Sequence, residues 1–98
     1  MTFQKDLENH EIKALHRLVD FEDQHVLEVG CGEGRLTWNY ARSAKQVLGV
    51  DPDPDALRVA NYDMPDELRK TTVFTCASSL HLPFPGDTFD IALLSWSL

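Results

Sequence analysis

The sequence predicts an α/β fold with a doubly wound parallel sheet, and three observations support this prediction. Short apolar segments alternate with amphipathic ones along the 98 residues. A glycine-rich turn follows the first apolar segment, as in the first half of a βαβ unit. The apolar segments are nearly continuous, which is typical of parallel strands covered on both faces. Such alternation favours a parallel sheet with right-handed crossovers.

The chain is expected to begin with an amphipathic helix. Apolar residues recur at helical spacing in the polar segment 6–20, at Ile12, Leu15, Leu18 and Val19. Residues 1–24 are therefore assigned to an N-terminal segment with an amphipathic helix, and the helix is expected to end near Asp20. Residues 25–98 form the sheet-containing half-domain, and His25 to Val29 are its first strand.

The next elements alternate between helix and strand. After the glycine turn, one helical face is formed by Leu36, Tyr40, Ala41 and Ala44. Residues 47–50 form a second strand that ends at Asp51. Asp53 followed by Pro54 suits a helix start, since Asp caps free amides and Pro is favoured at the first helical position. The apolar face of that helix continues through Leu57, Ala60 and Met64.

The last part of the sequence predicts two more strands. Residues 72–76 form the third, residues 84–87 have Pro and Gly where a type II turn requires them, and residues 89–96 form the fourth. An apolar strand without a neighbour rarely ends a protein. We therefore expect an N-terminal part of a longer chain, truncated after the fourth strand and inactive alone.

Composition narrows the function classes. The hydrophobic share is 43%, which is typical of a globular domain, and the formal net charge is −7. That charge disfavours binding to nucleic acid or anionic membranes. There is no signal peptide and no apolar stretch that could span a bilayer, so a cytoplasmic protein is predicted. Most of the acids between Asp51 and Glu67 are expected on a solvated helix face.

Three glycines, Gly30, Gly32 and Gly34, directly follow the first strand. Alternate glycines indicate a contorted backbone or a close neighbour, and they can let amides at the next helix face an anion. Asp51 comes at the carboxyl end of the second strand, where a carboxylate can bind ribose hydroxyls. Together these residues predict a site for an adenosine-containing ligand.

The loop pattern separates the cofactor classes. The dinucleotide pattern Gly-x-Gly-x-x-Gly needs a third glycine where this sequence has Arg35. The sequence instead reads "VLEVGCGEG", then "VLGVDPDPDAL" and "LHLPFPGDTFDIALLSWSL". In order and spacing these three segments resemble the class I S-adenosylmethionine-dependent methyltransferases, which have a Rossmann-like fold. The resemblance covers nearly all of residues 25–98.

The resemblance implies S-adenosylmethionine as cofactor and a set of binding residues. The loop backbone, Cys31 included, would lie against the methionine part, and Glu28 would help to hold its amino group. Asp51 would bind the ribose, and Pro52 would lie against the adenine. The family often has an Asp for the adenine amino group where this sequence has Ser78, and the backbone of Ser79 is a further candidate.

No catalytic residue is predicted, and a small-molecule methyl acceptor is expected, since the motifs of DNA base-amino and cytosine-carbon methyltransferases are absent near residues 94–97. Two alternatives stay open: a nicotinamide-dependent oxidoreductase and a non-catalytic S-adenosylmethionine-binding module.

A calcium loop at 51–62 is disfavoured by Ala56 and Tyr62. No metal site is predicted, because the histidines and cysteines lack ligand spacing.

Overall fold

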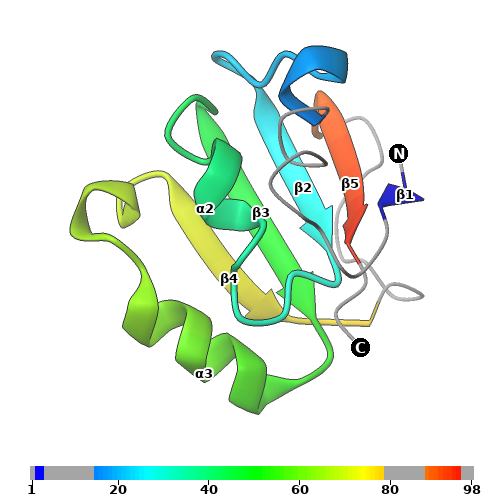
Figure 1. Cartoon of the computed structure of the whole chain (residues 1–98). Helices are drawn as coiled ribbons and strands as arrows, with labels where there is room; N and C mark the ends of the chain where they lie inside the picture. Colours follow the sequence, from blue (N-terminus) through cyan, green and yellow to red (C-terminus); the bar gives the residue numbers. More distant parts are fainter. Residues whose placement is uncertain (1, 4–14, 79–87, 96–98) are drawn as a thin grey trace.

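The computed structural model describes residues 2–3, 15–78 and 88–95 of the chain (Figure 1). Several predicted features lie outside these residues: most of the N-terminal helix, the turn at 84–87, Ser79 and Trp96. Residues 15–18 are helical, at the place where the predicted N-terminal helix was expected to end.

The described strands form one sheet in which every pairing is parallel. The strands are β1 (Thr2–Phe3), β2 (His25–Val29), β3 (Gln46–Asp51), β4 (Thr72–Cys76) and β5 (Ile91–Ser95). Their order across the sheet is β1-β5-β2-β3-β4. The predicted α/β parallel sheet is confirmed, and the four predicted strands are present with ends shifted by no more than a few residues.

The edge next to β5 differs from the expectation. β1 pairs in parallel with the end of β5, with Thr2 beside Leu94 and Phe3 beside Ser95. The expectation that the fourth predicted strand lacks a neighbour was therefore wrong. A two-residue strand offers no hydrophobic periodicity from which it could have been predicted.

The strand order reverses between β2 and β5. The chain runs outward from β2 through β3 to β4, and then returns to the other side of β2 as β5 (Figure 1). In open α/β sheets, ligands bind outside the carboxyl ends of the strands at such a reversal. The fold therefore places the candidate site where β2 and β5 end.

Two helices follow the strands β2 and β3 in the chain. Helix α3 (Pro54–Asp63) begins as predicted, and the Asp53 side chain caps it by accepting a hydrogen bond from the Asp55 amide at 2.9 Å. Helix α2 (Thr37–Tyr40) is shorter than predicted, because the chain turns at residues 41–43 to enter β3. The residues assigned to its apolar face are nonetheless buried.

The hydrophobic core lies in two clusters, one for each face of the sheet. The larger cluster joins the strands to α2 and to the 3-10 helix η1 (Asp66–Leu68), and includes Leu15, Phe21, Val26, Leu36, Tyr40, Ala41, Ala44, Val47, Met64, Leu68 and Leu93. The smaller cluster consists of Leu27, Val29 and Val50, with Leu48, Ala77, Phe89 and Leu94 packed against it. Alternate residues of the strands thus face opposite clusters, as a pleated sheet requires.

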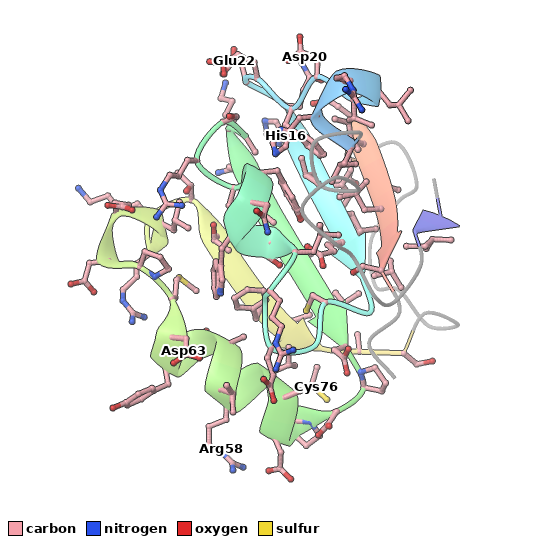
Figure 2. All side chains as sticks on the ribbon, viewed as in Figure 1. His16, Asp20, Glu22, Arg58, Asp63 and Cys76 are labelled. Atoms are coloured by element: carbon pink, nitrogen blue, oxygen red, sulfur yellow. The ribbon has the colours of Figure 1, made fainter. Side chains whose placement is uncertain are left out.

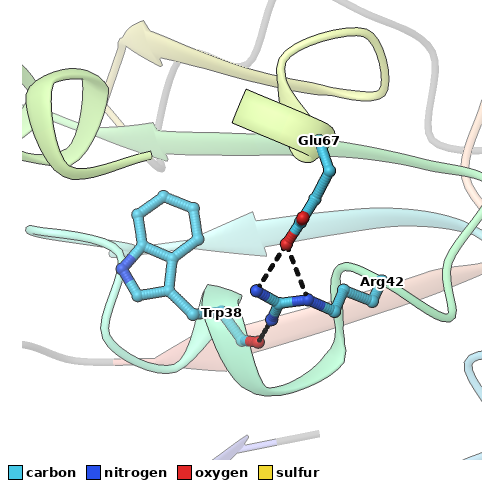
Figure 3. A network of polar contacts seen from close by, with 3 residues as sticks. All are labelled: Trp38, Arg42 and Glu67. Carbon is cyan, nitrogen blue, oxygen red and sulfur yellow. Dashed lines mark hydrogen bonds and ion pairs between the residues drawn. The ribbon is translucent and has the colours of Figure 1, made fainter. Parts of the chain in front are cut away.

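The acids after Asp51 lie mainly on the surface, as expected. One of them joins two elements: Glu67 of η1 accepts two hydrogen bonds from the Arg42 guanidinium, which also donates to the Trp38 carbonyl (Figure 3). Both side chains are more than half exposed, so the ion pair is worth little in free energy.

Gly49 of β3 has no space for a side chain. A Cβ atom there would lie 2.6 Å from the Phe74 ring of β4 and 3.0 Å from the Cys31 sulfur. We expect Gly49→Ala to lower the free energy of unfolding by about 1–3 kcal/mol through overpacking, as measured by urea denaturation. In a Phe74→Leu background the same substitution should cost less, and an equal cost in both backgrounds would contradict this account.

Candidate functional site

The loop between β2 and α2 has a contorted backbone at all three glycines. The φ angles are +81° at Gly30, +55° at Gly32 and +87° at Gly34. These angles lie in the left-handed region, which side chains with a Cβ atom rarely adopt. The glycines are therefore needed for the path of the chain, as the sequence indicated.

One of the glycines also has a close neighbour. A Cβ atom on Gly34 would lie 2.6 Å from the indole ring of Trp38, one turn further along the chain. Trp38 in turn packs edge-to-face on Phe74, with ring centroids 5.7 Å apart. Gly34 of the loop therefore lies against Trp38 of α2, which packs on Phe74 of β4.

Four amides of the loop have partners within the chain. Gly30 and Cys31 donate to the Val50 carbonyl at 2.8 and 3.2 Å, and Gly34 donates to the Cys31 carbonyl at 3.0 Å. Gly32 donates to the Asp51 carboxylate at 2.9 Å. The loop folds back on β3, whose end supplies the acceptors for Gly30, Cys31 and Gly32. The expectation that amides at the start of the next helix face an anion concerns other residues and stays a prediction.

Asp51 links this loop to the start of α3. Its side chain is buried at the carboxyl end of β3, one oxygen accepting from the Gly32 amide and the other from the Asp53 amide at 2.9 Å. A carboxylate oxygen can accept more than one hydrogen bond, so both oxygens keep capacity for a ligand hydroxyl. Asp51 is thus held in place before any ligand binds.

The remaining predicted site residues gather near Asp51. The Ala77 amide donates to the Asp51 carbonyl at 3.1 Å, which brings the neighbouring Ser78 to the same edge of the sheet. Pro52 is exposed, and its carbonyl lies 3.5 Å from the Cys76 sulfur. Figure 2 shows Cys76 at the opposite end of the molecule from His16. Ser79 lies outside the described residues.

Glu28 has an environment that the sequence did not reveal. Its side chain is 0% exposed, although it lies in an otherwise apolar strand. One carboxylate oxygen accepts from the Thr37 hydroxyl at 2.7 Å and the Tyr40 hydroxyl at 2.6 Å, and the other accepts from the Ser95 hydroxyl at 2.5 Å. We call Glu28 and these three hydroxyls the carboxylate cage.

Burial governs the ionisation of this region. It raises the pKa of the Glu28 carboxyl above its usual value, while the hydrogen bonds from Ser95, Tyr40 and Thr37 oppose the rise. Burial, together with the Glu28 charge, also raises the pKa of Tyr40, so its phenol stays protonated and donates. Burial, with the charges of Glu28 and Asp51, raises the pKa of the Cys31 thiol.

Sequence reasoning did not identify the three hydroxyl residues as part of the site. A signal existed: an acid inside an apolar strand must find donors when it is buried. Thr37 and Tyr40 are spaced three apart on α2 and so lie on one helical face. Ser95 interrupts the apolar strand β5, but it lies 67 residues from Glu28 in the sequence, so no local pattern indicates that the two side chains form a hydrogen bond.

Among the described residues, no group of three or more His, Cys, Asp and Glu side chains could hold a metal ion. Within that part of the chain there is also no helix with the length and apolar character needed to cross a membrane.

Comparison with known proteins gives the family. The family model described as "Methyltransferase domain" matches residues 26–98. The chain belongs to this family. The predicted resemblance and the fold class are thereby confirmed for this domain, and the match does not identify an acceptor.

Individual relatives share part of their length with this methyltransferase domain. The demethylmenaquinone methyltransferase of Lactococcus lactis is 26% identical over 89 residues, covering 88% of this chain and 35% of that protein. The crystal structure of an S-adenosylmethionine dependent methyltransferase from Mesorhizobium loti has a TM-score of 0.70 at 27% identity, covering 84% of this chain and 38% of that one. The 4+2 cyclase SpnF has a TM-score of 0.72 at 25% identity, covering 85% and 32%. The domain thus spans about a third of the curated relative.

The raised pKa of Glu28 predicts a pH dependence of stability. Its carboxyl ionises near the reference pKa of 4.5 in the unfolded chain and at higher pH in the fold, so the folded state binds more protons in between. The free energy of unfolding contributed by Glu28 should therefore fall as the pH rises from 4.5 through the folded pKa. Urea denaturation of the wild-type chain and of Glu28→Gln across this range tests the sign. A difference between the two proteins that stays constant with pH would contradict it.

The two cysteines should differ in reactivity. Cys76 is exposed, whereas Cys31 is buried and its pKa is raised. Since the thiolate is the reactive form, we expect iodoacetamide to modify Cys76 at least about tenfold faster than Cys31. Peptide mass mapping measures both rates, and Cys76→Ser isolates the slower one. In urea the rates should converge, and similar rates in the folded chain would refute the burial of Cys31.

Proposed function

We propose that this domain binds S-adenosylmethionine and forms part of an enzyme that transfers its methyl group to a small-molecule acceptor. Membership of the methyltransferase family supports the reaction class. The observation that supports the cofactor most directly is the use of loop amides within the chain. A loop in which the amides of Gly30, Cys31, Gly32 and Gly34 are already bonded suits a cofactor without phosphate groups.

The same observation argues against the nicotinamide alternative. A dinucleotide needs amides that point at its pyrophosphate, usually at the N-terminus of a full helix. Here the amides of Gly30, Cys31, Gly32 and Gly34 donate to β3 or to the loop itself. Helix α2 has only four residues, so it offers little dipole for an anion.

The proposed binding residues follow the carboxyl ends of the strands. The loop backbone at Gly30, Cys31, Gly32 and Gly34 would lie against the methionine part of the cofactor. Asp51 would accept hydrogen bonds from the ribose hydroxyls with the capacity left on its oxygens. Pro52 would lie against the adenine, and Ser78 with the backbone of Ser79 would bind its amino group without the charge assistance of an Asp.

The electrostatics of the chain suit this cofactor. S-adenosylmethionine carries a positive sulfonium, and the chain has a formal net charge of −7. The same charge disfavours a nucleic-acid acceptor, which supports a small molecule. We propose the cytoplasm as the location, since such an acceptor and cofactor are available there.

Methyl transfer requires mainly that the cofactor and the acceptor are aligned with each other. The acceptor atom attacks the methyl carbon in line with the departing sulfur, so the protein must position both molecules and exclude water. A base is needed only if the acceptor must lose a proton. We assign no described residue to that role.

A second candidate is a domain that binds the cofactor without transferring the methyl group. Structural similarity to SpnF supports this second candidate, because SpnF is named as a 4+2 cyclase. A related fold can therefore serve a reaction other than methyl transfer. Measuring methyl transfer by the protein at its natural length separates the two candidates.

Ligand titration tests the proposed cofactor. We expect calorimetry on the protein at its natural length to detect binding of S-adenosylhomocysteine and none of NADH. Asp51→Ala should weaken binding by about tenfold or more, because it removes the ribose acceptor and the anchor of the Gly32 amide. Asp53→Ala is the matched control: it removes an acid and a helix cap two residues away and should change affinity less than about twofold. Binding of NADH alone would overturn the proposal.

A further inference from the structure

We propose that Glu28 is a positioning residue that fixes both ends of the cofactor loop through the hydroxyls of Thr37, Tyr40 and Ser95, and that it does not contact the cofactor. This inference rests on the proposed function. It departs from the expectation that Glu28 would help to hold the amino group of the methionine part.

Burial is the first reason. The Glu28 side chain is 0% exposed, and its two oxygens already accept three hydrogen bonds at 2.5 to 2.7 Å. Because none of its surface is exposed, a ligand at the edge of the sheet could reach the carboxylate only if the side chains around it moved.

The position of the acid in the chain is the second reason. Glu28 comes two residues before Gly30, where the loop begins, and Thr37 and Tyr40 are on α2, where the loop has ended. A single carboxylate therefore holds the two ends of the loop together. Ser95 adds the end of β5, since its hydroxyl also lies 3.2 Å from the Gly30 carbonyl.

The donors are themselves held in place. The ring of Tyr40 stacks on Phe21 with centroids 4.6 Å apart and an interplanar angle of 19°. Phe21 contacts the ring of His16 edge-to-face at 5.7 Å, and His16 bonds to the Asn39 carbonyl at 2.8 Å. The Tyr40 hydroxyl therefore meets Glu28 with little freedom to turn towards another acceptor.

The chain provides a matched pair of buried threonines for the test. Thr37 is in the cage, whereas the Thr72 hydroxyl, at the other end of the sheet, is buried without a hydrogen-bond partner among the described residues. Replacement by valine makes the same chemical change at both positions. We expect Thr37→Val to weaken S-adenosylhomocysteine binding about tenfold and Thr72→Val to change it less than about twofold. Both are measured well below the melting temperature, so that loss of stability is not counted as loss of affinity.

Two more variants keep the test open if Thr37→Val does not fold. Tyr40→Phe removes only a hydroxyl, and Ser95→Ala does the same at the end of β5. Each should weaken binding, and Ser95→Thr, which keeps the hydroxyl, should restore it. If the variants that fold bind S-adenosylhomocysteine as tightly as the wild type, the positioning role is wrong, although the proposed function still stands.

A second ligand distinguishes positioning from direct contact. Glu28→Gln is titrated with S-adenosylhomocysteine and with its analogue that lacks the α-amino group. A positioning residue should lose affinity for both ligands by the same factor, because the loop itself has changed. A loss confined to the ligand that has the amino group would show direct contact and overturn the inference. Failure of the wild-type protein to bind either ligand would instead overturn the proposed function.

Discussion

The buried carboxylate of Glu28 is the constraint on which the arrangement around the glycine loop depends. A charge in an apolar sheet is tolerated only if hydrogen bonds replace its water. The donors come from two elements, Thr37 and Tyr40 on α2 and Ser95 on β5. The helix must therefore begin directly after the loop, and β5 must lie beside β2. The acid thus links the local path of the loop to the topology of the whole sheet.

The loop itself is stabilised mainly by β3. The glycines of the loop adopt left-handed angles, and Val50 and Asp51 accept the amides of Gly30, Cys31 and Gly32. A loop with this bonding keeps its shape without a ligand, and preorganisation of this kind lowers the entropic cost of binding. These three amides are therefore not available to an anion. Both consequences suit a cofactor recognised through a ribose and an amino acid rather than through a pyrophosphate.

The features predicted from the sequence are those specified over short distances. Alternating apolar segments predicted the strands β2 to β5, and the Asp53-Pro54 pair predicted the start of α3. The place of Asp51 at the end of a strand predicted it as a site residue. The features missed depend on distant partners. The edge strand β1 forms only by pairing with β5, and the space at Gly49 is limited by Phe74 on another strand. Ser95 belongs to the site only because its hydroxyl bonds to Glu28. No local pattern encodes such pairings, although a buried acid in an apolar strand indicates that donors must exist.

The reversal of strand order explains why these distant partners meet at the site. Because β5 returns to the other side of β2, Ser95 lies beside Glu28 although β3 and β4 come between them in the sequence. Methyl transfer depends on alignment more than on reactive side chains. A chain that serves such a reaction can use buried polar groups to hold its binding loop in place, and the hydrogen bonds of Thr37 and Tyr40 to Glu28 suit that use.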